Sequence, residues 1–214
     1  MYSVVLFGTG SPVIVDIEES CARRDWRILA WIKNVDGPDY PAGAGAITRA
    51  TAETRLSDPV LLPMFDPAHR ARALDHARVL GAREFPVLID PTSVLPRAIA
   101  IGEGSYINAG CTLGAAARIG RFVFINRGSG LGHHLVLGDF ASIGPGVVMA
   151  GQVTVGRAAL IGAGAVIGPG TTIGEGAMIA PGAVVRHDVP AGAKVAGNPA
   201  RIVEPAGQAG SGPS

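Results

Sequence analysis

An aliphatic residue returns at every sixth position from residue 89 to residue 185 without interruption. The residue after each of these positions is small or polar, and most often it is glycine. A period of six suits neither an α-helix nor a flat, half-buried strand, but it does suit a short strand followed by a corner. The sequence therefore predicts a solenoid of hexapeptide repeats. The series comprises Ile89, Leu95, Ile101, Ile107, Leu113, Ile119, Ile125, Leu131, Leu137, Ile143, Met149, Val155, Ile161, Ile167, Ile173, Ile179 and Val185.

The repeat also predicts the register of the solenoid. Three hexads make a coil of about 18 residues, so residues i and i+18 should stack about 4.8 Å apart, the distance between paired strands. The aliphatic residue should point inward, and Met149 should fill a gap in the interior. We expect the glycines that follow to turn the chain by adopting positive φ.

Composition and charge exclude several classes of protein. The net charge is +1 and there is no basic run, which argues against nucleic acid as a partner. There is no apolar stretch of membrane-spanning length, and the first residues are typical of a strand rather than of a signal peptide. Cys21 and Cys111 show no metal spacing. We therefore predict a cytoplasmic protein with reduced cysteines and without a membrane partner.

The first 87 residues have a different pattern, in which strands alternate with helices. This predicts a small Rossmann-like α/β domain that binds substrate. The second helix should begin at Asp66 and Pro67, as N-cap and first helical residue, and end at Gly81. We predict strands at 3–8, 26–32 and 60–65, helices at 13–24 and 66–80, a loop at 34–47, the solenoid at 88–203 and a disordered tail at 204–214.

The turn Gly8-Thr9-Gly10-Ser11 follows a predicted strand and opens a predicted helix. Backbone amides and the helix dipole could hold a phosphate there. A tight turn without a ligand is the alternative, and no acidic residue closes the second strand where a ribose would bind. Asn34 and Asp36 are the nearest polar residues.

A histidine pair in the middle of the solenoid is the stronger candidate site. His133 follows the inward Leu131 by two residues, which places it at a corner on the outer surface. Gly151 lies eighteen residues further on, so its amide should lie one coil above His133. A base and an N–H donor arranged in this way could activate a nucleophile and hold an oxyanion. The alternative is that His133 and His134 are two solvated surface histidines.

Several motifs resemble those of known sugar O- and N-acetyltransferases. They are the junction Phe85-Pro86-Val87-Leu88-Ile89-Asp90-Pro91, the segments Gly132-His133, Gly138-Asp139-Phe140 and Ala150-Gly151, and the terminal Asp188-Val189-Pro190 and Ala196-Gly197-Asn198-Pro199-Ala200-Arg201. With the N-terminal GxG unit, they make the chain similar to the hexapeptide family of the sialic acid O-acetyltransferase and the bacillosamine-pathway acetyltransferase. The resemblance implies a left-handed parallel β-helix, acetyl-CoA as co-substrate, no metal, a sugar nucleotide as acceptor, and a homotrimer with CoA between neighbours.

The resemblance also implies residue roles. His133 would be the general base, His134 would stand beside it, and the Gly151 amide would bind the thioester carbonyl. The implied substrate residues are Gly8, Gly10, Ser11, Asn126 and Ser142, and the implied CoA residues are Gly151, Ala163, Gly197, Asn198 and Pro199.

Three departures distinguish the chain from that family. His134 occupies the place of an Asp or Glu that orients the base, Ser142 replaces a second histidine, and the phosphate turn is about two residues short. We therefore keep three functions open: an acyltransferase on an amino or hydroxyl group of a nucleotide-linked sugar, a zinc enzyme resembling carbonic anhydrase, and a non-catalytic scaffold. The spacing of His133, His134 and His187 does not favour the zinc site.

Overall fold

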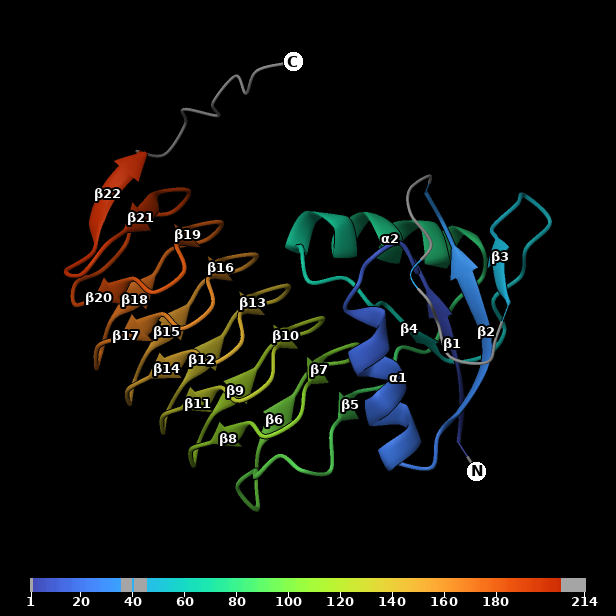
Figure 1. Cartoon of the computed structure of the whole chain (residues 1–214), viewed down its shortest axis with the longest axis horizontal. Coiled ribbons are helices and arrows are strands. Elements are labelled where there is room, and N and C mark those ends of the chain that lie inside the picture. Colours follow the sequence, from blue (N-terminus) through green and yellow to red (C-terminus); the bar gives the residue numbers. More distant parts are fainter. Residues whose placement is uncertain (1, 36–39, 41–45, 205–214) are drawn as a thin grey trace.

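The computed structural model describes residues 2–35, 40 and 46–204. An α/β unit at the N-terminal end stands beside a long β-helix, whose coils extend away from it (Figure 1). Most of the predicted loop at 34–47, and the predicted tail apart from residue 204, lie outside the described residues. The domain boundaries remain predictions.

The N-terminal unit is a parallel sheet with two helices. In chain order its elements are β1 (Ser3–Phe7), α1 (Ile14–Arg23), β2 (Arg27–Lys33), β3 (Ile47–Arg49), β4 (Val60–Leu61) and α2 (Pro67–Val79). The strand order is β3-β2-β1-β4, so the direction of winding reverses between β1 and β4. In open α/β sheets, ligands bind outside the carboxyl ends of the strands at such a switch point.

Both predicted helices are present, and the ends of α2 follow from local chemistry. The Asp66 side chain accepts a hydrogen bond from the His69 amide at 2.7 Å, and Pro67 occupies the first turn of α2. Gly81 follows the helix with a φ of +102°. The third strand is shorter than predicted, because regular pairing with β1 ends at Leu61. Strand β3 falls where the sequence predicted the end of a loop, and its three residues pair with β2.

The solenoid is a three-sided β-helix in which most strands are two residues long. Its faces are sheets of eight, five and five strands. The strands are β5 (Leu88–Ile89), β6 (Ala100–Ile101), β7 (Tyr106–Ile107), β8 (Thr112–Leu113), β9 (Arg118–Ile119), β10 (Phe124–Ile125), β11 (Gly130–Leu131), β12 (Val136–Leu137), β13 (Ser142–Ile143), β14 (Val148–Met149), β15 (Thr154–Val155), β16 (Leu160–Ile161), β17 (Val166–Ile167), β18 (Thr172–Ile173), β19 (Met178–Ile179), β20 (Val184–Val185), β21 (Lys194–Ala196) and β22 (Arg201–Glu204).

The register follows the 18-residue coil. Ile125 pairs with Ile143, and Ile143 pairs in turn with Ile161, all in parallel strands. These three residues are fully buried, and Met149 lies in the same core. The hexapeptide arithmetic therefore predicted correctly which residues stack in the interior.

The corners differ from the prediction in one respect. The glycine directly after each inward residue is needed for space: a β-carbon on Gly132 would lie 2.5 Å from the Ala150 carbonyl carbon in the next coil. Positive φ occurs two residues further on, where His134 has a φ of 55°. Glycines at that later position, such as Gly128 and Gly146, adopt positive φ as predicted. The glycine that directly follows an inward residue is instead required by the close approach of neighbouring coils.

One buried arginine joins the two parts of the chain. Arg70 of α2 is 1% exposed, and its guanidinium points into the solenoid rather than into solvent. Burial lowers the pKa of Arg70 to about 9, still above neutral pH, so the side chain stays charged. Its hydrogen-bond acceptors are the backbone carbonyls of Met64, Phe65, Phe122, Phe140 and Ala141 and the hydroxyl of Ser142.

A second junction surrounds Asp90, whose side chain is fully buried. Burial alone would raise the pKa of this carboxyl, but hydrogen bonds from Thr92, Ser20 and Arg23 outweigh that effect and lower the pKa to about 2. Ser20 and Arg23 belong to α1, so the carboxylate ties the N-terminal unit to the first coil.

We expect Asp90→Asn to lower the free energy of unfolding at pH 7 by about 2 kcal/mol, since charge-assisted hydrogen bonds contribute about 1.5–3 kcal/mol. The folded-state pKa lies below the unfolded one, so this stabilisation is present above about pH 4 and is lost as pH falls through about 2. Urea unfolding of both proteins at pH 7, 5, 4 and 3 would measure the difference. A gap that stays constant from pH 7 to pH 3 would contradict the assignment.

Candidate functional site

The structure brings His133 and Gly151 together at one corner of the β-helix. The imidazole of His133 lies over Gly151: a β-carbon placed on the glycine would be 2.5 Å from the Cε1 and Nε2 atoms of the ring. The backbone fixes this stacking, because the Gln152 amide donates to the His133 carbonyl at 2.8 Å. The base candidate and the amide candidate therefore meet as the 18-residue spacing predicted.

His134 contacts the candidate base directly. The Nδ1 atoms of His133 and His134 are 2.9 Å apart, and the two rings are perpendicular. This contact requires one proton between the two nitrogens. If His133 carries that proton on Nδ1, its Nε2 lone pair is free to accept another. Both side chains are exposed, so a substrate can approach them.

The Gly151 amide is available to a ligand. Its carbonyl accepts a hydrogen bond from the Gly170 amide at 3.0 Å, but its own N–H donates to no acceptor in the described part of the chain. The preceding amide, that of Ala150, donates a hydrogen bond to the Ile167 carbonyl in the next coil. An outward N–H beside an imidazole can bind a carbonyl oxygen that becomes negatively charged.

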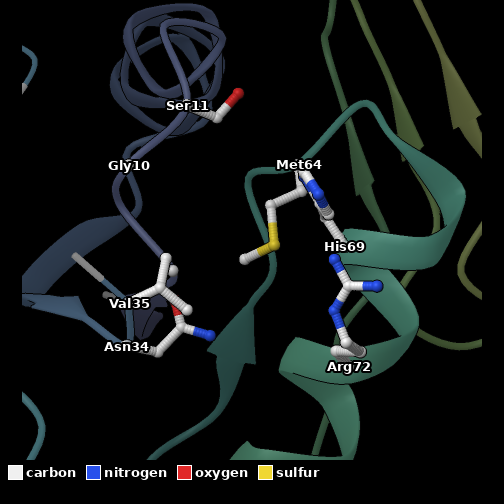
Figure 2. A pocket seen from close by; sticks show the side chains of 8 residues that line it. Gly10, Ser11, Asn34, Val35, Met64, His69 and Arg72 are labelled. Atoms are coloured by element: carbon white, nitrogen blue, oxygen red, sulfur yellow. The ribbon is translucent and has the colours of Figure 1, made fainter. Parts of the chain in front are cut away.

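A pocket of about 360 Å³ lies at the switch point of the N-terminal sheet. Gly8, Gly10 and Ser11 form one side of it after β1, and Asn34 and Val35 extend from the end of β2. Met64, His69 and Arg72 line the opposite side, and Figure 2 shows the last two projecting from α2. The turn predicted to bind phosphate thus borders an open cavity.

Other predicted site residues lie elsewhere. Asn126 is at the corner after β10, where its side-chain oxygen accepts a hydrogen bond from Asn108 at 3.0 Å. Ala163 and the turn at Gly197 follow strands of the same eight-stranded face, whereas Gly151 follows a strand of another face. One chain therefore does not bring the predicted CoA residues to a single corner.

Ser142 is the residue that the structure places least favourably for the predicted role. It is fully buried, and its hydroxyl donates to the Phe65 carbonyl at 2.6 Å and accepts from Arg70 at 2.9 Å. A substrate cannot reach it in this arrangement, so we withdraw Ser142 as a substrate contact. Its role is to help join the N-terminal unit to the solenoid.

The pocket also contains residues that the sequence analysis missed. His69 and Arg72 stand three positions apart, so they project from the same side of α2. A histidine and an arginine on one side of the first turns of a helix that follows a strand at a switch point would have indicated this side of the pocket from the sequence.

Within residues 2–35, 40 and 46–204, no three His, Cys, Asp or Glu side chains are grouped so that they could hold a metal ion. In the same part of the chain, no helix has the length and apolar character needed to cross a membrane.

Comparison with known proteins identifies the repeat and the fold. Residues 152–187 match the family model described as bacterial transferase hexapeptide. The chain carries a transferase hexapeptide repeat. Among curated proteins, a sequence search finds no significant match.

Several solved structures share the whole architecture. A variant of perosamine N-acetyltransferase from Caulobacter crescentus, in complex with CoA and GDP-perosamine, is 26% identical with a TM-score of 0.83, over 94% of this chain and 96% of that one. The acetyltransferase domain of PglB from Neisseria gonorrhoeae, in complex with acetyl coenzyme A, is 25% identical with a TM-score of 0.80, over 94% and 98%. WeeI from Acinetobacter baumannii is 25% identical with a TM-score of 0.79, over 95% and 100%.

These matches confirm the predicted fold class, an α/β unit followed by a left-handed parallel β-helix, and the resemblance to hexapeptide sugar acetyltransferases. The similarity covers both parts of the chain.

We expect Gly151→Ala to displace the His133 ring while leaving the fold intact. The new methyl group would overlap the imidazole, which is exposed and can rotate away, so the unfolding free energy should change by less than about 1 kcal/mol. The NMR signals of the His133 ring should shift markedly. Gly130→Ala is the matched control, because its β-carbon would make only ordinary contact with Thr112. Equal ring shifts in both variants would contradict the stacking.

Proposed function

We propose that this protein transfers an acetyl group from acetyl-CoA to an amino or hydroxyl group of a nucleotide-linked sugar. The observation that carries the proposal is the imidazole of His133 stacked over Gly151, whose amide donates to no acceptor in the described part of the chain. The structural neighbours that bind CoA or a sugar nucleotide support it.

In this mechanism His133 accepts a proton at Nε2 from the attacking amine or hydroxyl. The acceptor's lone pair forms a bond to the thioester carbonyl carbon, and the carbonyl oxygen becomes an oxyanion. The Gly151 N–H donates a hydrogen bond to that oxygen. The tetrahedral intermediate then collapses, the C–S bond breaks, and His133 returns its proton to the departing thiolate.

His134 is a positioning residue in this mechanism. By accepting a hydrogen bond from Nδ1 of His133, it selects the tautomer in which Nε2 is unprotonated. A carboxylate would do the same and would also stabilise the imidazolium electrostatically. The neutral imidazole of His134 supplies the orientation with less of that stabilisation.

A homotrimer would explain why the predicted CoA residues occupy two corners. In a groove between neighbouring copies, the corner with Gly151 could face the corner with Ala163 and the turn Gly197-Asn198-Pro199 of the next copy. Outward-facing Val148 and Val166 give one face of the β-helix an exposed apolar column that suits contact between copies. The cytoplasmic location remains a prediction. The free, buried thiols of Cys21 and Cys111 are consistent with it.

We expect His133→Ala to lower kcat by about 10²–10⁴-fold, the usual effect of removing a positioned general base. His134→Ala should cost less, and His134→Asp should raise activity by restoring a carboxylate partner. Acetyl-CoA affinity, measured by isothermal titration, should change little in all three. Thiol release over a panel of sugar nucleotides at several pH values would measure turnover. Unchanged turnover in His133→Ala would remove the residue from the mechanism, and absence of transfer by the unmodified protein would favour the scaffold alternative.

We expect light scattering at micromolar concentration to give three times the chain mass of 21.7 kDa. Val148→Arg should shift the distribution toward smaller species, because a charge would replace an apolar side chain at the proposed contact. Arg118→Lys, a change that preserves the charge on another face, is the control. A monomer mass for the unmodified protein would overturn the trimer.

A further inference from the structure

The histidine pair at the corner of the β-helix has a geometry that suits a metal ion as well as a shared proton. The Nδ1 atoms of His133 and His134 face each other at 2.9 Å, and the two rings are perpendicular. Two nitrogens bound to one metal at about 2.0–2.1 Å lie about 2.9 Å apart when the angle at the metal is about 90°, and about 3.3 Å apart when the angle is tetrahedral. The separation therefore matches neighbouring ligands of a tetragonal or square-planar ion, which Cu²⁺ and Ni²⁺ favour, rather than those of tetrahedral Zn²⁺.

The backbone brings the two ligand atoms together. His134 has a φ of 55°, so its side chain does not alternate with that of His133 as it would in an extended chain. The His134 amide donates to the Ala115 carbonyl of the preceding coil at 2.9 Å, and the His133 carbonyl accepts from the Gln152 amide of the next coil at 2.8 Å. Because both residues are held from both sides, chelation requires little further ordering of the chain.

The surroundings of the pair are open and uncharged. Both imidazoles are exposed. The residues that contact them from the adjacent coils, Ala115, Gly151 and Gln152, carry no charge that would repel a cation. Since no third ligand of the His, Cys, Asp or Glu type joins the pair within the described residues, water would occupy the other coordination positions.

Metal binding would rearrange the protons of the pair. In the tautomer suited to catalysis, His133 carries its proton on Nδ1 and shares it with Nδ1 of His134. A metal bound to both Nδ1 atoms takes the place of that proton, which moves to Nε2 of His133 by exchange with solvent. No net proton is released, but the Nε2 lone pair is no longer free to accept a proton from a substrate.

We propose that His133 and His134 form a two-histidine site for Cu²⁺ and, more weakly, for Ni²⁺, and that its occupation inhibits the protein. The order of the two metals follows from their general affinities for nitrogen ligands. Binding stands on the geometry of the pair alone, whereas inhibition rests on the proposed function. The site differs from a zinc centre of the carbonic anhydrase type, which needs three histidines, so the metal exchanges readily with solution.

The test is titration of the full-length protein with CuCl₂, without CoA or acceptor, followed by electron paramagnetic resonance. We expect a tetragonal Cu²⁺ signal with coupling to two nitrogens. His133→Ala and His134→Asn should each lower the affinity about tenfold or more and leave coupling to one nitrogen, because the second ligand of a chelate binds intramolecularly. Asparagine is chosen at 134 because it tolerates positive φ.

His187→Ala is the matched control. It removes an exposed histidine from a later coil of the same solenoid and leaves the pair intact. This variant should bind Cu²⁺ with the affinity and the two-nitrogen signal of the unmodified protein. Cys21 and Cys111 are buried, which limits reduction of the metal during the titration.

Inhibition is measured with Ni²⁺, because Cu²⁺ oxidises the thiol of CoA. Ni²⁺ should suppress thiol release, a chelator should restore it, and His134→Asn should require about tenfold more Ni²⁺ for half-inhibition. Thiol release that is unchanged when Ni²⁺ is bound would overturn the inhibition.

Unchanged Cu²⁺ affinity in both pair variants would overturn the site, as would a one-nitrogen signal in the unmodified protein or an equal loss of affinity in His187→Ala. Because binding is measured without CoA or acceptor, the expected Cu²⁺ results would support the site even if the protein transferred no acetyl group. That combination would contradict the acetyltransferase proposal alone.

Discussion

The position of the N-terminal unit on the solenoid depends on one buried guanidinium, that of Arg70. Arg70 forms no ion pair with the described carboxylates, although Asp66 is close enough to raise its pKa. Its charge is satisfied by backbone carbonyls from two coils and from the segment that follows β4. The carbonyls of Met64, Phe122 and Phe140 accept no other hydrogen bond within the described part of the chain, so the arginine and the coils stabilise one another. Because Arg70 lies in the first half of α2, it fixes the position of the helix and of every side chain on it.

The buried contacts of Arg70 position one of the two candidate sites, the pocket, but not the other, the histidine corner. The pocket is built from strand ends and from α2, and it takes its position from Arg70 and Asp90. The histidine corner is built from consecutive coils, and it takes its position from the backbone hydrogen bonds of the solenoid. The two candidate sites are therefore held in place by separate sets of contacts.

The sequence predicted what a regular period can determine. A repeat of six residues specifies the inward stack and the pairing of residue i with residue i+18. Because His133 and Gly151 are 18 residues apart, their contact could be predicted from the repeat. The start of α2 after Asp66 was equally predictable, because its N-cap and its proline act through local contacts.

Contacts between distant segments were not predictable in this way. Ser142 occupies an outward strand position and looked accessible, but the N-terminal unit covers that face of the solenoid. The inward turn of Arg70 and the outward turn of Arg72 depend on how α2 docks, which no local pattern encodes. The requirement for glycine at positions such as Gly132 comes from the close approach of the next coil, which a local turn pattern does not show.

The stacking of coils also gives the solenoid a scale of length. Each 18-residue coil advances the chain by about 4.8 Å, so Gly151 and Gly197 are separated by a height that the number of intervening coils determines. A co-substrate held at both places would have to span that height. A substitution within a corner would leave the height unchanged, whereas the gain or loss of a complete coil would change it by one strand spacing.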